Sequence, residues 1–196
     1  MKRIKTFALG ALFLALASGP ALAVGPYMKT AGTTSRPIGH DQFCRQYSSE
    51  CNERSARSYK VKMSNKRWRE LVSVNADVNL SVRPVTDQEH YGVEEHWTYP
   101  QGYGDCEDYV LMKRYMLMQK GWPASALLIT VVLQPDGSGH AVLTARTSKG
   151  DYILDNLRPD VQVWTKTPYQ YLKRQSSRDS ARWVRIADNR YQYAQR

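Results

Sequence analysis

The stretch Gly104-Asp105-Cys106-Glu107-Asp108-Tyr109, with residues 110–118 after it, decides how the chain is read. A cysteine lies here among three carboxylates, at the first turn of a predicted amphipathic helix. Asp105 is placed as the N-cap, and Asp108 occupies the position of the acid in a capping box. Residues 110–118 supply a broad apolar face, and Gly121 and Pro123 end the helix.

The position of Cys106 leaves two interpretations open. The free N–H groups and the dipole at a helix N-terminus favour a thiolate, and such sites can lower a thiol pKa from ~8.5 to about 3.5–7.5. A free cysteine is also among the most buried residue types, so Cys106 can equally be a small apolar core residue. Helix position alone does not decide between a reactive and a structural cysteine.

Residues 1–23 have the pattern of a cleaved signal peptide. Basic residues Lys2, Arg3 and Lys5 precede an apolar run over residues 7–17, and Ala21-Leu22-Ala23 forms a cleavage site of small residues. The apolar run is too short to span a bilayer, and no later stretch reaches the length of about 18 apolar residues that a membrane helix needs. We therefore expect a mature protein that begins near Val24 and is exported to the periplasm without an integral membrane segment.

The mature chain is moderately basic. Residues 1–23 hold three basic and no acidic residues, so 25 basic and 18 acidic residues remain, a net charge of +7. This excess suits an anionic substrate or an envelope surface. The basic residues are scattered, and no basic run interleaved with aromatic residues forms a nucleic-acid module. Nucleic acid is therefore not an expected partner.

The chain contains Cys44, Cys51 and Cys106. In an oxidising compartment an even number of cysteines pairs, and an odd one stands out. Cys44 and Cys51 flank a turn-like Ser48-Ser49 and can close a short loop, so we predict a disulfide between them. Cys106 is then the unpaired thiol, which favours a functional role over a structural one.

Hydrophobic periodicity predicts a single α+β domain over residues 40–190, preceded by a flexible arm over residues 24–39. A helix begins after Ser64, and the pattern becomes strand-like after the cysteine helix. The predicted strands are residues 127–133, 140–147, 152–157 and 183–186. Thr167, followed by Pro168 and Gln170, predicts one more helix. The expected architecture is a central helix packed against an antiparallel sheet.

Residues 84–102 form a connecting stretch that is rich in proline, glycine, glutamate and aromatic residues. Its aromatic density just before Cys106 is typical of a cleft wall. A loop that only covers the core would have the same composition, so both interpretations stay open.

A histidine and an aspartate follow the cysteine on the next predicted strands. His140 comes after a glycine-rich turn, and Asp155 lies in Leu154-Asp155-Asn156. Cysteine, histidine and aspartate in this order suit a nucleophile, a base and an orienting carboxylate. A two-residue turn at Lys149-Gly150 would, however, place Asp155 opposite Thr144 and leave it about 13 Å from His140 along the strands, at ~3.3 Å per residue. A shift in register is needed to bring the two together.

Three motifs resemble those of the bacterial transglutaminase-like cysteine proteinases, periplasmic enzymes of the LapG type. They are Gly104-Asp105-Cys106-Glu107-Asp108-Tyr109, Gly139-His140-Ala141-Val142-Leu143 and Leu154-Asp155-Asn156, and the similarity runs over residues 43–186. The resemblance implies a papain-like and transglutaminase-like fold, with Cys106 as nucleophile, His140 as base and Asp155 as orienter. It implies a protein substrate in the cell envelope and leaves room for a membrane receptor as regulator. Trp97 is a candidate donor to the oxyanion.

The resemblance also implies calcium bound by Asp105, Glu107 and Asp108. A physical argument supports it, because three carboxylates beside Cys106 would raise the pKa of the thiol. Clustered oxygens attract calcium, whose charge would offset that field. Alternatively, Asp105 and Asp108 cap the helix while Glu107 points into water.

Three functions are compatible with these residues. The first is a peptidase that cuts one specific envelope or surface protein. The second is an acyl-transfer enzyme that uses the same triad with an amine acceptor. The third is a non-catalytic transglutaminase-like binding module, which the complete set of Cys106, His140 and Asp155 disfavours.

Overall fold

The structure is a computed structural model that describes residues 25–190. The predicted signal peptide over residues 1–23 lies outside this range. Within residues 25–190, no helix combines the length and the apolar character needed to cross a membrane.

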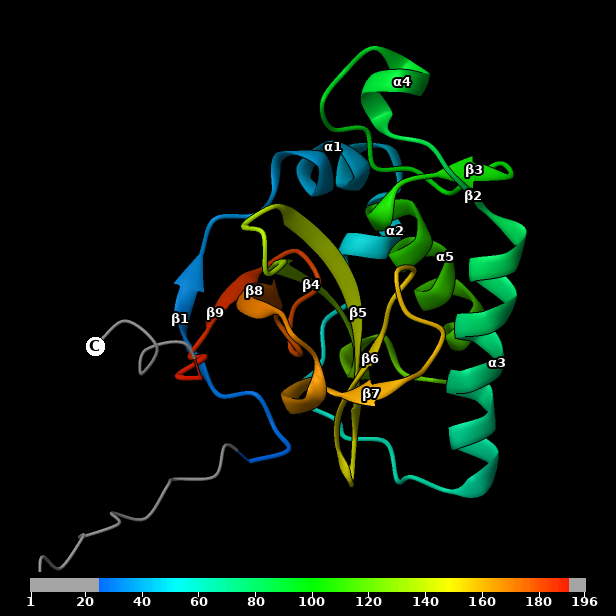
Figure 1. The fold of residues 1–196 in the computed structure, drawn as a ribbon. Helices are drawn as coiled ribbons and strands as arrows, with labels where there is room; N and C mark the ends of the chain where they lie inside the picture. The colour runs from blue at the N-terminus through cyan, green and yellow to red at the C-terminus, as the bar shows by residue number, and fades with distance from the viewer. Residues whose placement is uncertain (1–24, 191–196) are drawn as a thin grey trace, which may run out of the picture.

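A seven-stranded sheet forms the centre of the fold, in the order β1-β9-β8-β4-β5-β6-β7, with antiparallel neighbours throughout (Figure 1). Its strands are β1 (Thr30–Thr34), β4 (Leu127–Leu133), β5 (Gly139–Thr147), β6 (Gly150–Leu154), β7 (Gln162–Val163), β8 (Gln170–Gln175) and β9 (Trp183–Ile186). A second sheet pairs β2 (Arg83–Pro84) with β3 (Tyr103–Gly104) in parallel. The four predicted strands are present, and β1, β7 and β8 are additional.

The helices cover one side of the sheet. They are α1 (Ile38–Gln46), α2 (Ser48–Cys51), α3 (Asn65–Ser81), α4 (Asp87–Tyr91) and α5 (Cys106–Gln119), with 3-10 turns η1 (Ala124–Ala126) and η2 (Trp164–Lys166). Figure 1 shows α5 between the sheet and α3, which forms the outer layer. Ser64 caps α3 as expected, because its side chain accepts a hydrogen bond from the Arg67 N–H at 3.2 Å. The predicted α+β class, with a central helix on an antiparallel sheet, is confirmed.

Both faces of the sheet are buried, because successive side chains of a strand point to opposite faces. In β5, Ala141, Leu143 and Ala145 belong to the core that includes α5 and α3. Val142 belongs to the second core, which contains Trp164. Burial on both sides fixes the sheet in place, since each fully buried aliphatic or aromatic side chain contributes about 1.5–3 kcal/mol.

The register of β5 against β6 differs from the expected one by two residues. Thr147 pairs with Gly150, so the turn consists of Ser148 and Lys149 instead of Lys149 and Gly150. Leu143 then pairs with Leu154, which places Asp155 level with Val142 rather than with Thr144. The offset between His140 and Asp155 along the strands falls from four residues to two, about 7 Å. Side chains can span this offset, and no bulge is needed.

The prediction of a helix from Thr167 is wrong. The segment leads directly from η2 into β8. Arg190 donates hydrogen bonds to the carbonyl oxygens of Thr167 and Tyr169 at 3.2 and 2.5 Å, and the Tyr169 side chain is only 2% exposed. Tertiary contacts therefore satisfy the backbone groups that a helix would have used, and they override the local sequence signal.

The segment predicted as a flexible arm is joined to the domain. Thr30–Thr34 form β1, which pairs with β9 at the edge of the sheet. The backbone N–H of Met28 donates to buried Asp151 at 3.0 Å, and the Met28 side chain is 6% exposed. Glycine- and threonine-rich composition signals an irregular segment, but it does not reveal an available strand edge.

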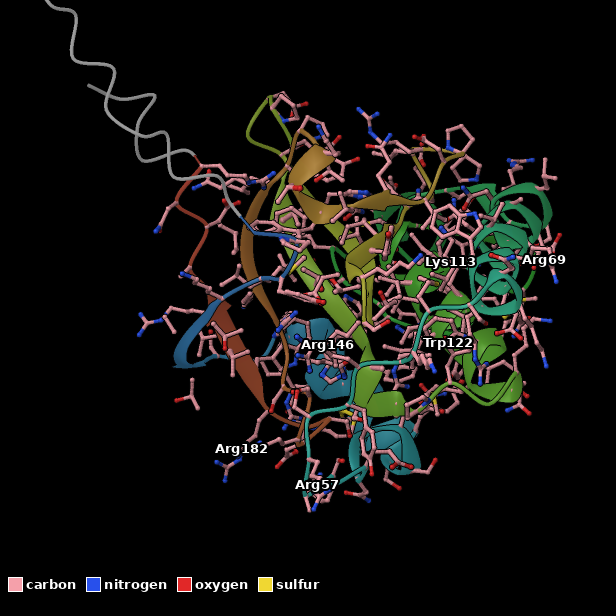
Figure 2. The ribbon with its side chains drawn as sticks, turned by 90° about the horizontal axis from the view of Figure 1, so that it is seen from below. Arg57, Arg69, Lys113, Trp122, Arg146 and Arg182 are labelled. Atoms are coloured by element: carbon pink, nitrogen blue, oxygen red, sulfur yellow. A yellow bond between two sulfur atoms is a disulfide. The ribbon has the colours of Figure 1, made fainter. Side chains whose placement is uncertain are left out.

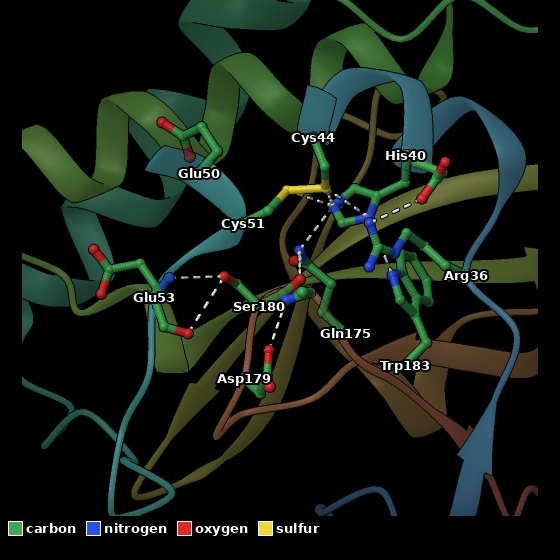
Figure 3. The surroundings of a disulfide bond; sticks show 12 residues. Arg36, His40, Cys44, Glu50, Cys51, Glu53, Gln175, Asp179, Ser180 and Trp183 are labelled. Carbon is green, nitrogen blue, oxygen red and sulfur yellow. Dashed lines mark hydrogen bonds and ion pairs between the residues drawn. A yellow bond between two sulfur atoms is a disulfide. The ribbon is translucent and has the colours of Figure 1, made fainter. Parts of the chain in front are cut away.

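The predicted disulfide between Cys44 and Cys51 is confirmed, with a Cα–Cα distance of 5.6 Å. It joins α1 to α2, and Figure 3 shows buried His40 beside it, hydrogen bonded to Gln175 and Trp183. Burial lowers the pKa of His40 to about 3, so this ring is neutral at ordinary pH. The disulfide and His40 pack together, and His40 also contacts Trp97, with the two ring centres 5.5 Å apart.

Replacing Cys44 and Cys51 with alanine should lower the free energy of unfolding by roughly 2–3 kcal/mol, because the crosslink restricts a short loop in the unfolded chain. Urea unfolding followed by circular dichroism measures this difference. The matched control keeps Cys44 and Cys51 and carries Cys106→Ala. When dithiothreitol reduces its disulfide, its free energy of unfolding should fall by a similar amount. Equal midpoints with and without the disulfide would contradict the prediction.

Candidate active site

Cys106 begins α5 directly after β3, and Gly104 shapes this junction. A Cβ on Gly104 would lie 2.5 Å from Asp108 Oδ2, so only glycine leaves room for that carboxylate. Asp105 occupies the N-cap position, but its side chain makes no capping hydrogen bond. Asp108 Oδ1 accepts from the Thr98 N–H at 2.9 Å. The acids of the motif therefore do not act as the predicted capping box, and Asp108 instead holds the preceding loop.

The Cys106 thiol is paired with its neighbour in sequence. Sγ donates a hydrogen bond to Glu107 Oε2 at 2.8 Å. Burial and then the Glu107 carboxylate raise the pKa of the thiol, while the Ala141 backbone N–H works in the opposite direction. The effect of the helix N-terminus is therefore outweighed here, and the thiol is protonated in this arrangement.

His140 and Asp155 form a buried pair, 5% and 3% exposed. His140 Nε2 lies 2.9 Å from Asp155 Oδ1, which also accepts from the Leu157 N–H at 2.9 Å. Asp155 Oδ2 accepts a short hydrogen bond from the Tyr169 hydroxyl. Burial alone would raise the pKa of Asp155, but the hydrogen bonds and charge of His140, together with the Tyr169 bond, hold it below its ordinary value. Asp155 is therefore a carboxylate at neutral pH.

Two asparagines of α3 hold the backbone of Asp155. Asn75 Oδ1 accepts from the Asp155 N–H at 3.0 Å, and Asn79 Nδ2 donates to the Asp155 carbonyl at 2.8 Å. Sequence reasoning did not identify either residue. Asn75 did leave a signal, because it stands at a core position of an apolar helix stripe, and a buried amide requires partners. Tyr169 left none, since its segment reads as a helix.

Cys106 and His140 line one cavity of about 250 Å³. Its other lining residues are Pro37, Glu95, Trp97, Glu107, Val131, Gly139, Ala141 and Lys173. The stretch over residues 84–102 thus supplies part of a cleft wall, one of the two interpretations left open. The Trp97 indole N–H donates to Glu95 Oε2 at 2.8 Å, so this candidate oxyanion donor is engaged by Glu95.

Three carboxylates gather beside the cysteine. Asp87, Asp105 and Asp108 each place an oxygen within 4.8 Å of the others. Asp105 Oδ1 and Asp108 Oδ2 are buried and have no hydrogen-bond partner among residues 25–190. Burial and the neighbouring acids raise the pKa of Asp87, and they raise that of Asp108 to about 8. Negative charge in this cluster is therefore poorly compensated, which suits a hard cation.

The cluster differs from the set Asp105, Glu107 and Asp108 that the family resemblance implies. The structure brings Asp105 and Asp108 together with Asp87, from the start of α4, whereas the Glu107 carboxylate accepts a hydrogen bond from the Cys106 thiol. Burial and Asp105 raise the pKa of Glu107 to about 8. Asp87 lies far from the motif in sequence, and no spacing rule connects the two positions.

Comparison with known proteins assigns the chain to a family. A family model described as bacterial transglutaminase-like cysteine proteinase matches residues 30–191. Comparison with curated proteins gave no significant match.

Among solved structures, the chain is similar to LapG of Legionella pneumophila. One LapG structure aligns at 24% identity and a TM-score of 0.50 over 59% of this chain and 66% of that one, just under two thirds. A calcium-bound LapG aligns at 19% identity and a TM-score of 0.53 over 78% and 82%. An EGTA-treated LapG aligns at 23% identity and a TM-score of 0.52 over 65% and 70%. These likenesses show the fold, and the family model shows membership: the chain belongs to the bacterial transglutaminase-like cysteine proteinase family.

Proposed function

We propose that this chain is an exported cysteine peptidase that cleaves a specific cell-envelope or surface protein. Cys106 is the nucleophile, His140 the base and acid, and Asp155 the orienting carboxylate. The observation that carries the proposal is the 2.9 Å hydrogen bond of His140 to Asp155, at a cavity that His140 and Cys106 line together. Membership of a cysteine proteinase family supports peptide-bond hydrolysis as the reaction.

The hydrogen bond with Asp155 sets the tautomer of His140. Because Asp155 is ionised, it can only accept a hydrogen bond, so the proton of the neutral imidazole lies on Nε2. Nδ1 is then free to take a proton from the thiol. Asn75 and Asn79 fix the backbone of Asp155, so the imidazole is held in one orientation. This rigidity favours catalysis, since the base need not be ordered again for each substrate.

The reaction begins when the Cys106 thiol exchanges its hydrogen bond with Glu107 for one with His140 Nδ1 and transfers its proton there. The sulfur forms a bond with the carbonyl carbon of the scissile peptide, and an electron pair moves onto the carbonyl oxygen. The proton on His140 then passes to the leaving amine as the C–N bond breaks, which leaves a thioester. His140 next takes a proton from water, the water oxygen attacks the thioester carbon, and the Cys106 sulfur leaves and is reprotonated.

Two donors stabilise the oxyanion in this scheme. The Cys106 backbone N–H, at the start of α5, is the first, and it is reinforced by the helix dipole. Trp97 is the second candidate. It can serve only after its indole N–H leaves Glu95, so substrate binding has to separate this pair.

The proposal includes calcium at the acid cluster. Asp87, Asp105 and Asp108 would hold the ion, and their unpartnered buried oxygens are the hard ligands that calcium prefers. When bound, calcium would supply positive charge that offsets the carboxylates beside Cys106. Glu107 is not part of this cluster, and its Oε2 accepts the hydrogen bond of the Cys106 thiol. Calcium-bound and EGTA-treated forms of LapG, a protein of the same fold, support testing this chain for the ion.

The predicted signal peptide places the protein in the periplasm in this proposal, with its substrate in the cell envelope. The net charge of +7 expected for the mature chain suits an anionic surface or substrate. The family resemblance extends the proposal to a membrane receptor as a regulator.

Cys106→Ala should abolish cleavage of the envelope substrate without changing the melting temperature, because it removes the nucleophile from a partly exposed position. Comparative proteomics of cells that carry the wild-type or the variant protein should show one new N-terminus only with the wild type. Arg57→Ala, at an exposed residue, is a control that should leave the cleavage unchanged. A cleaved N-terminus that persists with Cys106→Ala would refute the assignment of the nucleophile.

Calcium should raise the melting temperature of the purified mature protein. At about 100 times its dissociation constant, a ligand adds about 2.7 kcal/mol to the stability, which corresponds to roughly 5–10 °C for a domain of this size. Asp87→Asn should reduce this shift as strongly as Asp108→Asn, whereas Asp77→Asn, at an exposed position of α3, should not. Identical melting in calcium and in EGTA would exclude the site.

The calcium-free protein should become less stable as the pH rises. Burial raises the pKa of Asp108 to about 8, well above the value of ~3.9 in an unfolded chain. Such a group stabilises the fold fully below the unfolded pKa, and the contribution is lost as the pH approaches the folded pKa. In EGTA the melting temperature should therefore fall between about pH 5 and about pH 8, and Asp108→Asn should flatten this fall. A melting temperature that rises over the same window would contradict the prediction.

A further inference from the structure

The surface over α4 carries a chain of exposed aromatic rings. The ring centres of Tyr103 and His90 are 4.3 Å apart, and those of His90 and Tyr91 are 4.2 Å apart. The ring centre of His96 lies 4.3 Å from that of Tyr91. Tyr91 and Tyr103 are 43% and 38% exposed, and neighbouring Val93 is 45% exposed. We call these five side chains the α4 patch, and Figure 1 shows α4 at the top of the molecule, beyond α1 and β3.

The segment that carries most of the α4 patch is acidic, although the protein as a whole is basic. Residues 84–102 contain four of the 18 acidic residues of the chain and none of its lysines or arginines. One of the four, Glu94, is exposed directly beside the patch. By contrast, Figure 2 shows Arg57, Arg69 and Arg182 pointing outward from other parts of the surface. The α4 patch therefore differs in charge from the surface around the rest of the molecule.

Contacts to the domain hold the α4 patch in one position. Asp87 lies in the first turn of α4, is only 3% exposed, and accepts a short hydrogen bond from the backbone N–H of His96. Thr86 and Glu89 form a capping box at the start of α4. Both ends of the segment between Asp87 and His96 are therefore fixed. The rings need not be ordered again when a partner binds, which lowers the cost of association.

Exposed aromatic rings beside carboxylates fit a cationic side chain. The face of a tyrosine ring attracts a cation that lies within about 6 Å of its centre. The guanidinium of arginine is planar, stacks on aromatic rings and forms paired hydrogen bonds with a carboxylate. Tyr91 and Glu94 supply a ring and a carboxylate on one exposed segment. Arg83 is the nearest cation in the sequence, and its backbone pairs with Tyr103, so it offsets only part of the negative charge.

We propose that the α4 patch is a docking surface for an arginine-bearing segment of a partner protein. The guanidinium stacks on the exposed rings and pairs with Glu94. In the sequence, His96 of the patch stands between Glu95 and Trp97, which line the cavity of Cys106, so a docked segment lies beside this cavity. Docking involves no catalytic step, and the proposal is therefore independent of the proposed function.

The test titrates the Cys106→Ala protein, which should not cleave the probe, with a capped peptide of alternating glycine and arginine. A second peptide carries citrulline, which keeps the shape of arginine but has no charge. NMR chemical shifts locate the bound peptide, and their concentration dependence gives the dissociation constant. The test variants are Tyr91→Ala and Glu94→Gln. Their matched controls are Tyr59→Ala and Glu53→Gln, at exposed positions outside the α4 patch.

The arginine peptide should shift NMR signals of the α4 patch, and the citrulline peptide should not. Tyr91→Ala should weaken binding of the arginine peptide about two- to fivefold, as expected for the loss of one exposed cation–π contact. Glu94→Gln should weaken binding by a similar factor and reduce its dependence on salt, because an exposed ion pair is screened by salt. The two control variants should bind the peptide as the parent protein does.

Equal affinity for the arginine and citrulline peptides would overturn the proposal, as would unchanged affinity in both Tyr91→Ala and Glu94→Gln. A second copy of this basic chain is the other occupant to test, by sedimentation velocity of the protein without peptide. A dimer that Tyr91→Ala dissociates would assign the α4 patch to self-association and overturn the proposal of a separate partner. Failure of the proposed function is distinguishable, because it would appear as substrate cleavage by Cys106→Ala, whatever the peptide titrations show.

Discussion

The register of β5 against β6 is the constraint on which the proposed active site depends. The turn at Ser148 and Lys149 pairs Thr147 with Gly150 and thereby brings Asp155 within hydrogen-bond reach of His140. Side chains alternate with a period of two, so a shift by one residue would turn Asp155 to the opposite face of the sheet. Burial on both faces prevents such slippage, since Val142 and Leu143 pack into different cores. The geometry of the His140–Asp155 pair is therefore a consequence of ordinary core packing.

The acids around Cys106 impose a second constraint. A helix N-terminus stabilises a thiolate by typically 0.3–1 kcal/mol, whereas burial and an adjacent carboxylate act more strongly in the other direction. The structure shows the outcome, because the thiol donates to Glu107 and its pKa is raised. One carboxylate belongs to both groups, because Asp105 opposes the thiolate and also carries an unpartnered oxygen of the acid cluster. A cation there would relieve the cluster and the thiol together, which is why the calcium proposal and the nucleophile proposal are physically coupled.

Much of the fold was predictable because its signals are local. The helix at Cys106, the strands at β4, β5, β6 and β9 and the disulfide all follow from periodicity, turn residues and cysteine count. The helix expected at Thr167 failed because Arg190, remote in sequence, binds the carbonyls of that segment. Strand β1 was missed because it depends on a free edge at β9. Local signals cannot report on partners that only the folded chain supplies.

The site divides in the same way. Cys106, His140 and Asp155 were predicted as site residues from residue type and order, and one turn decided whether His140 and Asp155 could meet. The groups that surround them were not identified. Asp87, Asn79 and Tyr169 come from segments in which no motif marks them as neighbours of these three residues.

Helix α5 unites these groups. Its first turn carries Cys106 and Asp108, and the helix packs against β5. A small movement of α5 against β5 would therefore change the position of the proposed nucleophile, Cys106, relative to His140, which lies on β5. The acid cluster ties the N-terminus of α5 to α4 through Asp87, so any ligand bound there would act on this same movement. Ligand binding at the acid cluster would then affect Cys106 directly, because α5 carries residues of both sites and no further element is needed to couple them.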